Sequence, residues 1–392
     1  MSKHYDWIVV GGGITGVALS YELQRSGGKV LLLEAHPIPQ GATRYSYGGI
    51  PYWSGTTPLT RQLCEESITI HRQLSAELEM DTEFRELPLL LTIDLLDDPV
   101  AMASHYGNCT QSPLLLGVSS ACALEPLLNP KAINGAIKFD HAQVNPLSLL
   151  HAYGQAWQRL GGEYICDRVL TLRYDHKRIV GVNTRTDYYT GAGVIICAGG
   201  YTRGLLAQHQ IPCRIYFTHA ELIEVPSADA QLQTMVLPAH TKREELEASC
   251  SNLIADQNWD AVGLELMPAS IDAGAVQFRD GTIRMGQLSR VLTDPDATID
   301  REQSESQIRR AVERILPTIG RLKGNWYHCL VAFTCDGLPL VGQVPHQSGL
   351  YVFSGFTSPM VYVPPLAKRF AHFLTHGQDP LIPQLALDRY MN

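Results

Sequence analysis

The feature that most constrains the fold of this 392-residue chain is a glycine-rich turn near its N-terminus. An apolar run at residues 7–10 leads directly into Gly-Gly-Gly-Ile-Thr-Gly at 11–16, and good helix formers follow at 17–25. A second apolar run at 29–33 ends at Glu34. This order predicts a strand, a tight turn, a helix and a second parallel strand, which is the fingerprint of a dinucleotide-binding unit.

Each position of the turn has a physical role in such a unit. Gly11 permits the tight turn, Gly13 lets the backbone approach a pyrophosphate, and Gly16 lets the helix pack closely on the strand. The first helical turn, with Ile14 and Thr15, presents free N–H groups and a partial positive charge to the phosphates. A strand–helix turn of another α/β protein is the alternative, but the complete context favours the dinucleotide.

Size and composition exclude several classes of protein. A single core stops growing near ~250–300 residues, so two domains are predicted. Lys and Arg number 31 and Asp and Glu 39, and the net charge of −8 offers no long-range attraction to nucleic acid or anionic lipid. Nine cysteines without a CxxC motif indicate no metal site and no disulfide framework, so reduced thiols and a cytoplasmic location are predicted. No apolar run is long enough to predict a membrane span, and the oligomeric state stays open.

A second glycine-containing segment lies at residues 41–50, after Glu34 and Ala35. Glu34 can accept hydrogen bonds from an adenosine ribose, and the small and hydroxyl-bearing residues at 41–50 suit another close approach of backbone to ligand. This segment resembles the flavin-approach loop of the FAD-dependent D-amino-acid oxidase superfamily, which includes glycine and sarcosine oxidases.

The resemblance continues along almost the whole chain. Residues 138–146 resemble the superfamily's return segment, and residues 193–202 resemble its second FAD-contacting strand. Residues 334–342 resemble its Thr-Pro-Asp-Gly signature, with Cys335 where Pro is usual, and a strand and glycine turn follow at Gly355.

The resemblance implies an α/β fold in which a discontinuous Rossmann-type FAD-binding domain carries a second, α+β substrate domain built on an antiparallel sheet. The FAD-binding domain is expected at residues 1–85, 145–213 and 325–392, and the substrate domain at 86–144 and 214–324. The residues expected to contact FAD are Gly11, Gly13, Ile14, Thr15, Gly16, Glu34, Ala35, Ala42, Thr43, Arg44, Tyr47, Gly48, Gly49, Val169, Ala198, Gly199, Gly355, Thr357, Ser358, Pro359 and Met360.

Local patterns predict the elements between these motifs. Asn145 can cap a helix at 147–161, although Pro146 can equally begin its first turn. Residues 228–272 read as irregular and can include an insertion over the active site. Further helices are predicted at 57–78, 304–316 and 367–374, and strands at 84–94, 169–172, 179–184, 214–225 and 276–287, the last with a hairpin turn at Asp280-Gly281.

The resemblance implies oxidation of a C–N bond by hydride transfer to flavin N5, yet both usual anchors for a substrate carboxylate are missing. Val331 stands where glycine oxidases place an Arg, and residues 357–362 replace the loop that supplies a Lys in sarcosine oxidases. Tyr362 can donate one hydrogen bond in its place. Arg44 aligns with an Arg beside the flavin, and Arg284 with a Lys over N5, so these three residues are the catalytic candidates.

The predicted function is therefore an FAD-dependent oxidase or dehydrogenase of an amine or amino acid. Two alternatives stay open, namely a flavin dehydrogenase of a 2-hydroxy acid and a non-catalytic FAD-containing assembly or binding protein. Cys329 lies seven residues before Asp336, where sarcosine oxidases attach their flavin. Its apolar neighbours favour an inert packing role, so non-covalent FAD is predicted, with covalent attachment through Cys329 as the alternative.

Overall fold

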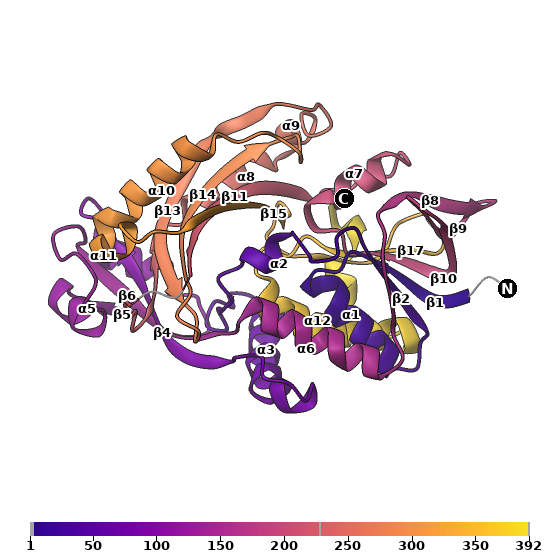
Figure 1. The fold of residues 1–392 in the computed structure, drawn as a ribbon, viewed down its shortest axis with the longest axis horizontal. Helices are drawn as coiled ribbons and strands as arrows, with labels where there is room; N and C mark the ends of the chain where they lie inside the picture. The colour runs from indigo at the N-terminus through magenta and orange to yellow at the C-terminus, as the bar shows by residue number, and fades with distance from the viewer. Residues whose placement is uncertain (1–3, 227–228, 391–392) are drawn as a thin grey trace.

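Two β-sheets organise the chain in the computed structural model, which describes residues 4–226 and 229–390 (Figure 1). In the first sheet, strands β1, β2, β7, β10 and β17 run parallel, and β16 and the β8–β9 hairpin are antiparallel additions. In the order β16-β17-β10-β1-β2-β7 the strands are Leu340–Gln343, Leu350–Ser354, Tyr188–Ile196, His4–Val10, Val30–Glu34 and Glu163–Cys166. The hairpin of β8 (Val169–Asp175) and β9 (Arg178–Thr184) joins the sheet by pairing β9 with β10.

Four helices form an apolar layer against this sheet, where Figure 1 shows α1, α6 and α12 side by side. They are α1 (Ile14–Arg25), α3 (Pro58–Glu77), α6 (Pro146–Arg159) and α12 (Pro359–His376). The start of α6 uses both predicted signals, because Asn145 Oδ1 accepts the backbone N–H groups of Leu147 and Ser148 at 3.0 and 3.3 Å while Pro146 occupies the first turn.

The second sheet is antiparallel apart from the parallel pair β12–β4, and α10 lies against it (Figure 1). In the order β15-β11-β14-β13-β12-β4-β6-β3, with β5 paired to β6, the strands are Asn325–Phe333, Tyr216–Val225, Ile283–Leu292, Glu265–Gln277, Met235–Pro238, Arg85–Ile93, Gly135–Gln143, Gly49–Ile50 and Leu114–Leu116. The remaining helices are α2 (Ala42–Tyr45), α4 (Pro99–His105), α5 (Val118–Leu124), α7 (Thr202–Ala207), α8 (Lys242–Cys250), α9 (Leu253–Asp256), α10 (Arg301–Ile315) and α11 (Pro317–Gly320). Short 3₁₀ turns occur at Gly199–Tyr201, Ile382–Leu385 and Leu387–Tyr390.

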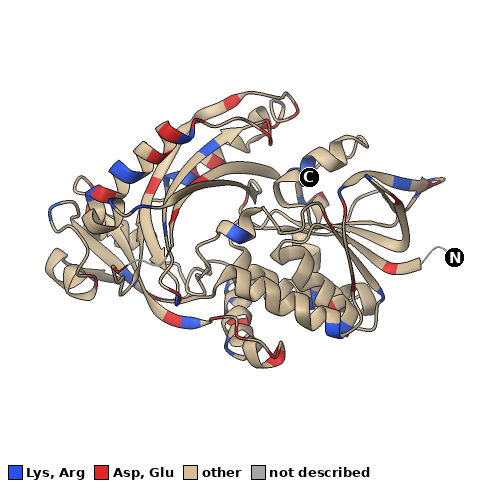
Figure 2. Ribbon diagram, in the orientation of Figure 1, with Lys and Arg blue, Asp and Glu red and all other residues tan. Residues whose placement is uncertain are grey.

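Charged residues are spread along the chain in both halves of the molecule (Figure 2). Basic and acidic residues alternate along α10, where Glu305 pairs with Arg309 at 2.8 Å. Such alternation is typical of a solvent-exposed helix face. Within residues 4–226 and 229–390, every helix is too short or too polar to cross a membrane.

The predicted fold class is confirmed, and three local predictions need correction. Strand β15 pairs with β11 of the second sheet, so the chain returns to the first sheet at β16 and not at residue 325. The described part of residues 228–272 is not irregular, since it contains β12, α8, α9 and the start of β13. Helix α12 begins eight residues before its predicted start at 367.

Two prolines explain why the start of α12 was predicted too late. Pro364 and Pro365 lie inside the helix, where a missing N–H group normally leaves a carbonyl without a partner and argues against helix. For Pro364 that carbonyl belongs to Met360, and the buried ring of His71 on α3 donates its Nε2–H to it at 2.7 Å. A side chain from a neighbouring helix thus compensates for a hydrogen bond that α12 lacks.

Three buried histidines make folding sensitive to acid. Burial lowers the pKa of His71 to about 4, of His141 to about 3 and of His219 to about 4. The folded chain keeps these rings neutral at pH 7, whereas the unfolded chain protonates them below about 6.5. The stability that they contribute is therefore present above pH 6.5 and is lost as the pH falls toward 4.

We expect the free energy of unfolding to fall between pH 6.5 and 4 by about 1.4 kcal/mol per pH unit for each histidine. Urea unfolding at several pH values measures this slope. His71→Gln keeps a donor for the Met360 carbonyl but cannot titrate. The pH slope of its free energy of unfolding should therefore be smaller by about 1.4 kcal/mol per pH unit. The control is the exposed His176→Gln. An unchanged slope in His71→Gln would contradict the assignment.

Candidate functional site

Three parallel strands of the first sheet end at the same edge, and each leads into a glycine. Gly11 follows β1, Gly199 lies just beyond β10, and Gly355 follows β17. At Gly11 no other residue fits, because φ is +111° and a Cβ atom would lie 2.5 Å from the carbonyl oxygen of Cys197. The edge therefore presents bare backbone to whatever lies beside it.

A cavity of about 710 Å³ runs along this edge, and we call it the strand-end cavity. It is lined by the glycine turn and the start of α1, by the end of β2, by residues 167–170, by residues 197–201 and by residues 354–356. The Glu34 carboxylate accepts the Gly12 N–H at 2.6 Å, and Thr43 Oγ1 accepts the Ile14 N–H at 3.0 Å. These two bonds connect the end of β2 and helix α2 to the glycine turn.

A second cavity, of about 520 Å³, lies between the second sheet and the start of α12, and we call it the inner cavity. Aromatic side chains that line it include Tyr45, Tyr47, Trp53 and Tyr106. The two cavities are adjacent, because both are lined by Ala42, Cys329, Phe356 and Pro359. Ligands in the two cavities would thus lie against the same four residues.

Most residues predicted to contact the cofactor line one of these cavities. Those of the strand-end cavity are Gly11, Gly13, Ile14, Thr15, Glu34, Ala35, Ala42, Thr43, Val169, Ala198, Gly199, Gly355 and Pro359. The inner cavity is lined by Tyr47, Gly49, Thr357, Ser358 and Met360, as well as by the shared Ala42 and Pro359.

Three other residues predicted to contact the cofactor line neither cavity. Gly16 packs the helix against the turn, since its Cβ atom would lie 1.9 Å from the carbonyl oxygen of Gly11. Gly48 is packed against the Val144 carbonyl in the same way. Arg44 lies with its guanidinium 5.6 Å from the centre of the Tyr45 ring.

The other two catalytic candidates, Arg284 and Tyr362, also lie outside both sets of lining residues. The buried Arg284 forms an ion pair with Glu224 at 2.8 Å and donates to the carbonyl of Ser46. Tyr362 is buried in the helix layer of the first sheet. These positions favour structural roles, and the catalytic roles of Arg44, Arg284 and Tyr362 stay predictions. Val331, in contrast, does line the inner cavity.

Among the residues that line the inner cavity, His141 was missed by sequence reasoning as a neutral donor, whereas Tyr47 was expected to contact FAD. The indole N–H of Trp53 can only donate, and it does so to His141 Nδ1 at 3.1 Å, so the proton of His141 lies on Nε2. That Nε2 and the hydroxyl of Tyr47 are buried and have no hydrogen-bond partner among the described residues. Burial raises the pKa of Tyr47, so its hydroxyl stays protonated.

Charged groups of the inner cavity come from the segment that read as irregular. Arg243 and Glu244 lie in the first turn of α8, and Asp272 lies on β13. The sequence indicated their position only through the expectation that residues 228–272 can include an insertion over the active site. No single residue could be chosen within that segment, because α8 has only three buried positions and no clear apolar stripe.

Comparison with known proteins gives a consistent family. Residues 6–373 match the FAD dependent oxidoreductase (DAO) family. The chain is 23% identical over 383 residues to glycine oxidase from Geobacillus kaustophilus, which covers 93% of this chain and 91% of that protein. It is 24% identical over 375 residues to monomeric sarcosine oxidase from Streptomyces avermitilis, which covers 91% of this chain and 90% of that one.

Solved structures support the same fold. The crystal structure of glycine oxidase from Geobacillus kaustophilus matches with a TM-score of 0.80 and 19% identity over 100% of both chains. L-proline dehydrogenase from P. horikoshii matches with a TM-score of 0.77 and 17% identity over 100% of this chain and 99% of that one. Because the family match spans nearly all of the sequence, this chain belongs to the FAD-dependent oxidoreductase family.

Proposed function

We propose that the chain oxidises the C–N bond of an amine or amino acid, with FAD in the strand-end cavity and the substrate in the inner cavity. The observation that carries this proposal is that the two cavities are adjacent and share the lining residues Ala42, Cys329, Phe356 and Pro359. Bound there, FAD would accept a hydride at its N5 atom from the carbon that carries the substrate nitrogen. The chain's own residues bind and orient both molecules and exclude water.

The residues of the strand-end cavity fit FAD. Gly11 and Gly13 leave room for a pyrophosphate beside the N-terminus of α1. Both Glu34 oxygens already accept backbone N–H groups, from Gly12 at 2.6 Å and from His36 at 3.0 Å. An ionised carboxylate has about four acceptor sites, so Glu34 can still accept from ribose hydroxyls. Glu34 would thereby hold the adenosine end of the cofactor.

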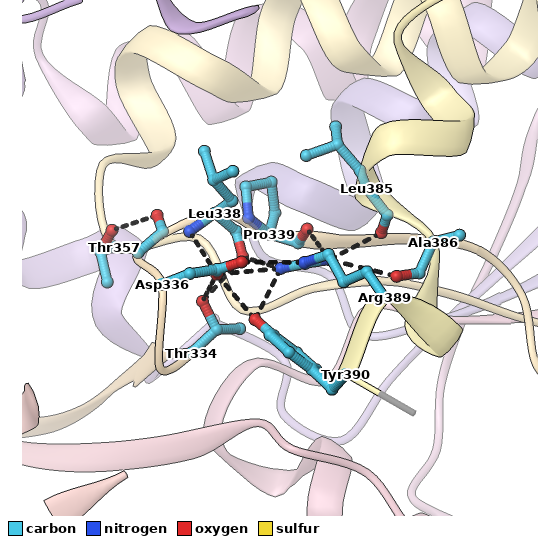
Figure 3. A network of polar contacts seen from close by, with 10 residues as sticks. Thr334, Asp336, Leu338, Pro339, Thr357, Leu385, Ala386, Arg389 and Tyr390 are labelled. Carbon is cyan, nitrogen blue, oxygen red and sulfur yellow. Dashed lines mark hydrogen bonds and ion pairs between the residues drawn. The ribbon is translucent and has the colours of Figure 1, made fainter. Parts of the chain in front are cut away.

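The signature loop between β15 and β16 is fixed by the C-terminal 3₁₀ turn (Figure 3). Arg389 donates Nε to Asp336 Oδ2 at 2.9 Å and Nη2 to Oδ1 at 3.0 Å, and Tyr390 donates its hydroxyl to Oδ1 at 2.7 Å. Burial alone would raise the pKa of Asp336, but the bonds from Arg389 and Tyr390 lower it below its ordinary value. The other side of the loop is linked to the cavities, since Thr357 donates to the Gly337 carbonyl at 3.3 Å.

We expect the purified protein to be yellow and to lose FAD in the variant Gly13→Leu. A large side chain at this position would occupy the space of the pyrophosphate, because Gly13 lines the strand-end cavity. The FAD-to-protein ratio after gel filtration measures the effect. Gly117→Leu is a control at an exposed helix start that lines neither cavity. Full FAD occupancy in Gly13→Leu would reject the placement.

We expect Arg389→Met to destabilise the folded protein by about 2 kcal/mol and to weaken FAD retention, because charged hydrogen bonds that hold the signature loop are lost. Urea unfolding and FAD dissociation measure the two effects. Arg321→Met is the control, since its ion pair with Glu313 is exposed and should change stability by less than about 1 kcal/mol. Equal FAD retention in both variants would limit the role of Arg389 to stability.

We expect FAD to be released when the protein is precipitated with acid. Cys329 lines both cavities, but burial raises the pKa of its thiol to about 12, whereas covalent attachment requires the thiolate. A yellow supernatant is the expected result. A yellow pellet that becomes colourless in Cys329→Ser would show covalent attachment instead.

We expect glycine and sarcosine to be poor substrates. Val331 lines the inner cavity where glycine oxidases place a cation, and each lost charged hydrogen bond costs roughly 1.5–3 kcal/mol. Anaerobic mixing with a panel of amines, amino acids and 2-hydroxy acids tests the reaction class by bleaching of the flavin band. Bleaching by 2-hydroxy acids alone would favour a flavin dehydrogenase of a 2-hydroxy acid. The absence of bleaching by every compound would favour a non-catalytic FAD-containing binding protein. Turnover of glycine at the rate of a dedicated glycine oxidase would contradict this prediction.

A further inference from the structure

Arg243 is the one Lys or Arg side chain among the described residues that line the inner cavity. It is the second residue of α8, and its side chain is 19% exposed. Its guanidinium forms no hydrogen bond within the described residues, and its one ion pair joins Nη1 to Glu247 Oε1 at 3.8 Å. An arginine offers five N–H donors, so most of the donors of Arg243 remain available to a ligand.

Three acidic residues act on Arg243, namely Glu244, which also lines the cavity, and Glu247 and Asp272, which accept hydrogen bonds from other donors. Glu247 Oε1 accepts the hydroxyl of Thr218 at 2.8 Å. The two oxygens of Asp272 accept the backbone N–H groups of Lys242 and Arg243 at 2.9 and 3.0 Å, and so cap the first turn of α8. Asp272 thereby fixes where α8 begins and where Arg243 enters the cavity.

Arg243 therefore carries a charge in a largely buried site with one long ion pair as its partner. Leaving a cation poorly paired in such a site is costly. A carboxylate in the cavity would satisfy it, because a carboxylate can take two parallel bonds from a guanidinium.

From this position we propose that Arg243 binds the carboxylate of the substrate in the inner cavity, so that the substrate is an amino acid or another amine that carries an acidic group. The statement that the bound anion is a substrate rests on the proposed function, whereas the statement that Arg243 binds an anion does not. It places the cation on α8, whereas the family's usual cations, which are missing here, belong to positions on β15 and near the start of α12.

The test uses the oxidised FAD-containing protein and two ligands of the same shape, benzoate and benzamide, detected by their perturbation of the flavin spectrum. The parent protein should bind benzoate more tightly than neutral benzamide. Arg243→Met should weaken benzoate about tenfold to a hundredfold and leave benzamide unchanged. Lys242→Met is the matched control, since this neighbour carries the same charge but does not line the cavity.

Glu247→Gln provides a change in the opposite direction. The glutamine can still accept from Thr218, but the negative charge that competes for Arg243 is removed, so benzoate should bind more tightly than in the parent. A purely structural role of Arg243 does not predict opposite effects of these two substitutions. If Arg243→Met loses FAD, the benzoate affinities of Arg243→Lys and Glu247→Gln test the proposal instead.

Equal benzoate affinity in the parent and in FAD-loaded Arg243→Met would overturn the inference. Failure of the parent to prefer benzoate over benzamide would overturn it as well, and so would unchanged benzoate affinity in both Arg243→Lys and Glu247→Gln. These measurements need no turnover. If no amine bleaches the flavin while benzoate binding still depends on Arg243, the proposed reaction fails and the anion site stands.

Discussion

The structure depends on backbone contacts that leave no room for side chains where β1 turns into α1. A Cβ atom at Gly16 would lie 1.9 Å from the carbonyl oxygen of Gly11, and one at Gly11 would lie 2.5 Å from that of Cys197. Any side chain at Gly11 or Gly16 would push β1, α1 and β10 further apart. The strand-end cavity follows from this packing, because the same glycines that permit it also expose backbone along the sheet edge.

Local sequence signals predicted the parts of the fold that are themselves local. The turn at 11–16, the cap at Asn145 and the hairpin at Asp280-Gly281 each need only neighbouring residues, and all three occur as expected. Helix α12 shows the limit of this reasoning. Its two internal prolines argue against helix, and the donor that compensates for one of them comes from His71, which is distant in sequence.

The candidate site was less predictable because its charges are paired across strands. Arg284 lies directly opposite Glu224 in the register of β14 and β11, and this pairing turns a candidate catalytic cation into a buried ion pair. Register is a property of the assembled sheet, so neither residue alone indicates it. Arg243 was missed because α8 shows little apolar periodicity, so its sequence does not indicate a helix at this place. The start of α8 is fixed by Asp272 on β13, which is distant in sequence.

Burial also determines which groups of the inner cavity can carry charge. His141 is held neutral because burial opposes its protonation and Trp53 donates to its Nδ1, and Tyr47 stays neutral because burial opposes loss of its proton. Arg243 remains charged, since the nearby Glu247 raises its pKa. The cavity therefore combines the cation of Arg243, the carboxylates of Glu244 and Asp272, and aromatic walls. Such a set can fix an anionic group through Arg243 and leave the rest of the ligand free to lie against Cys329 and Phe356, which line both cavities.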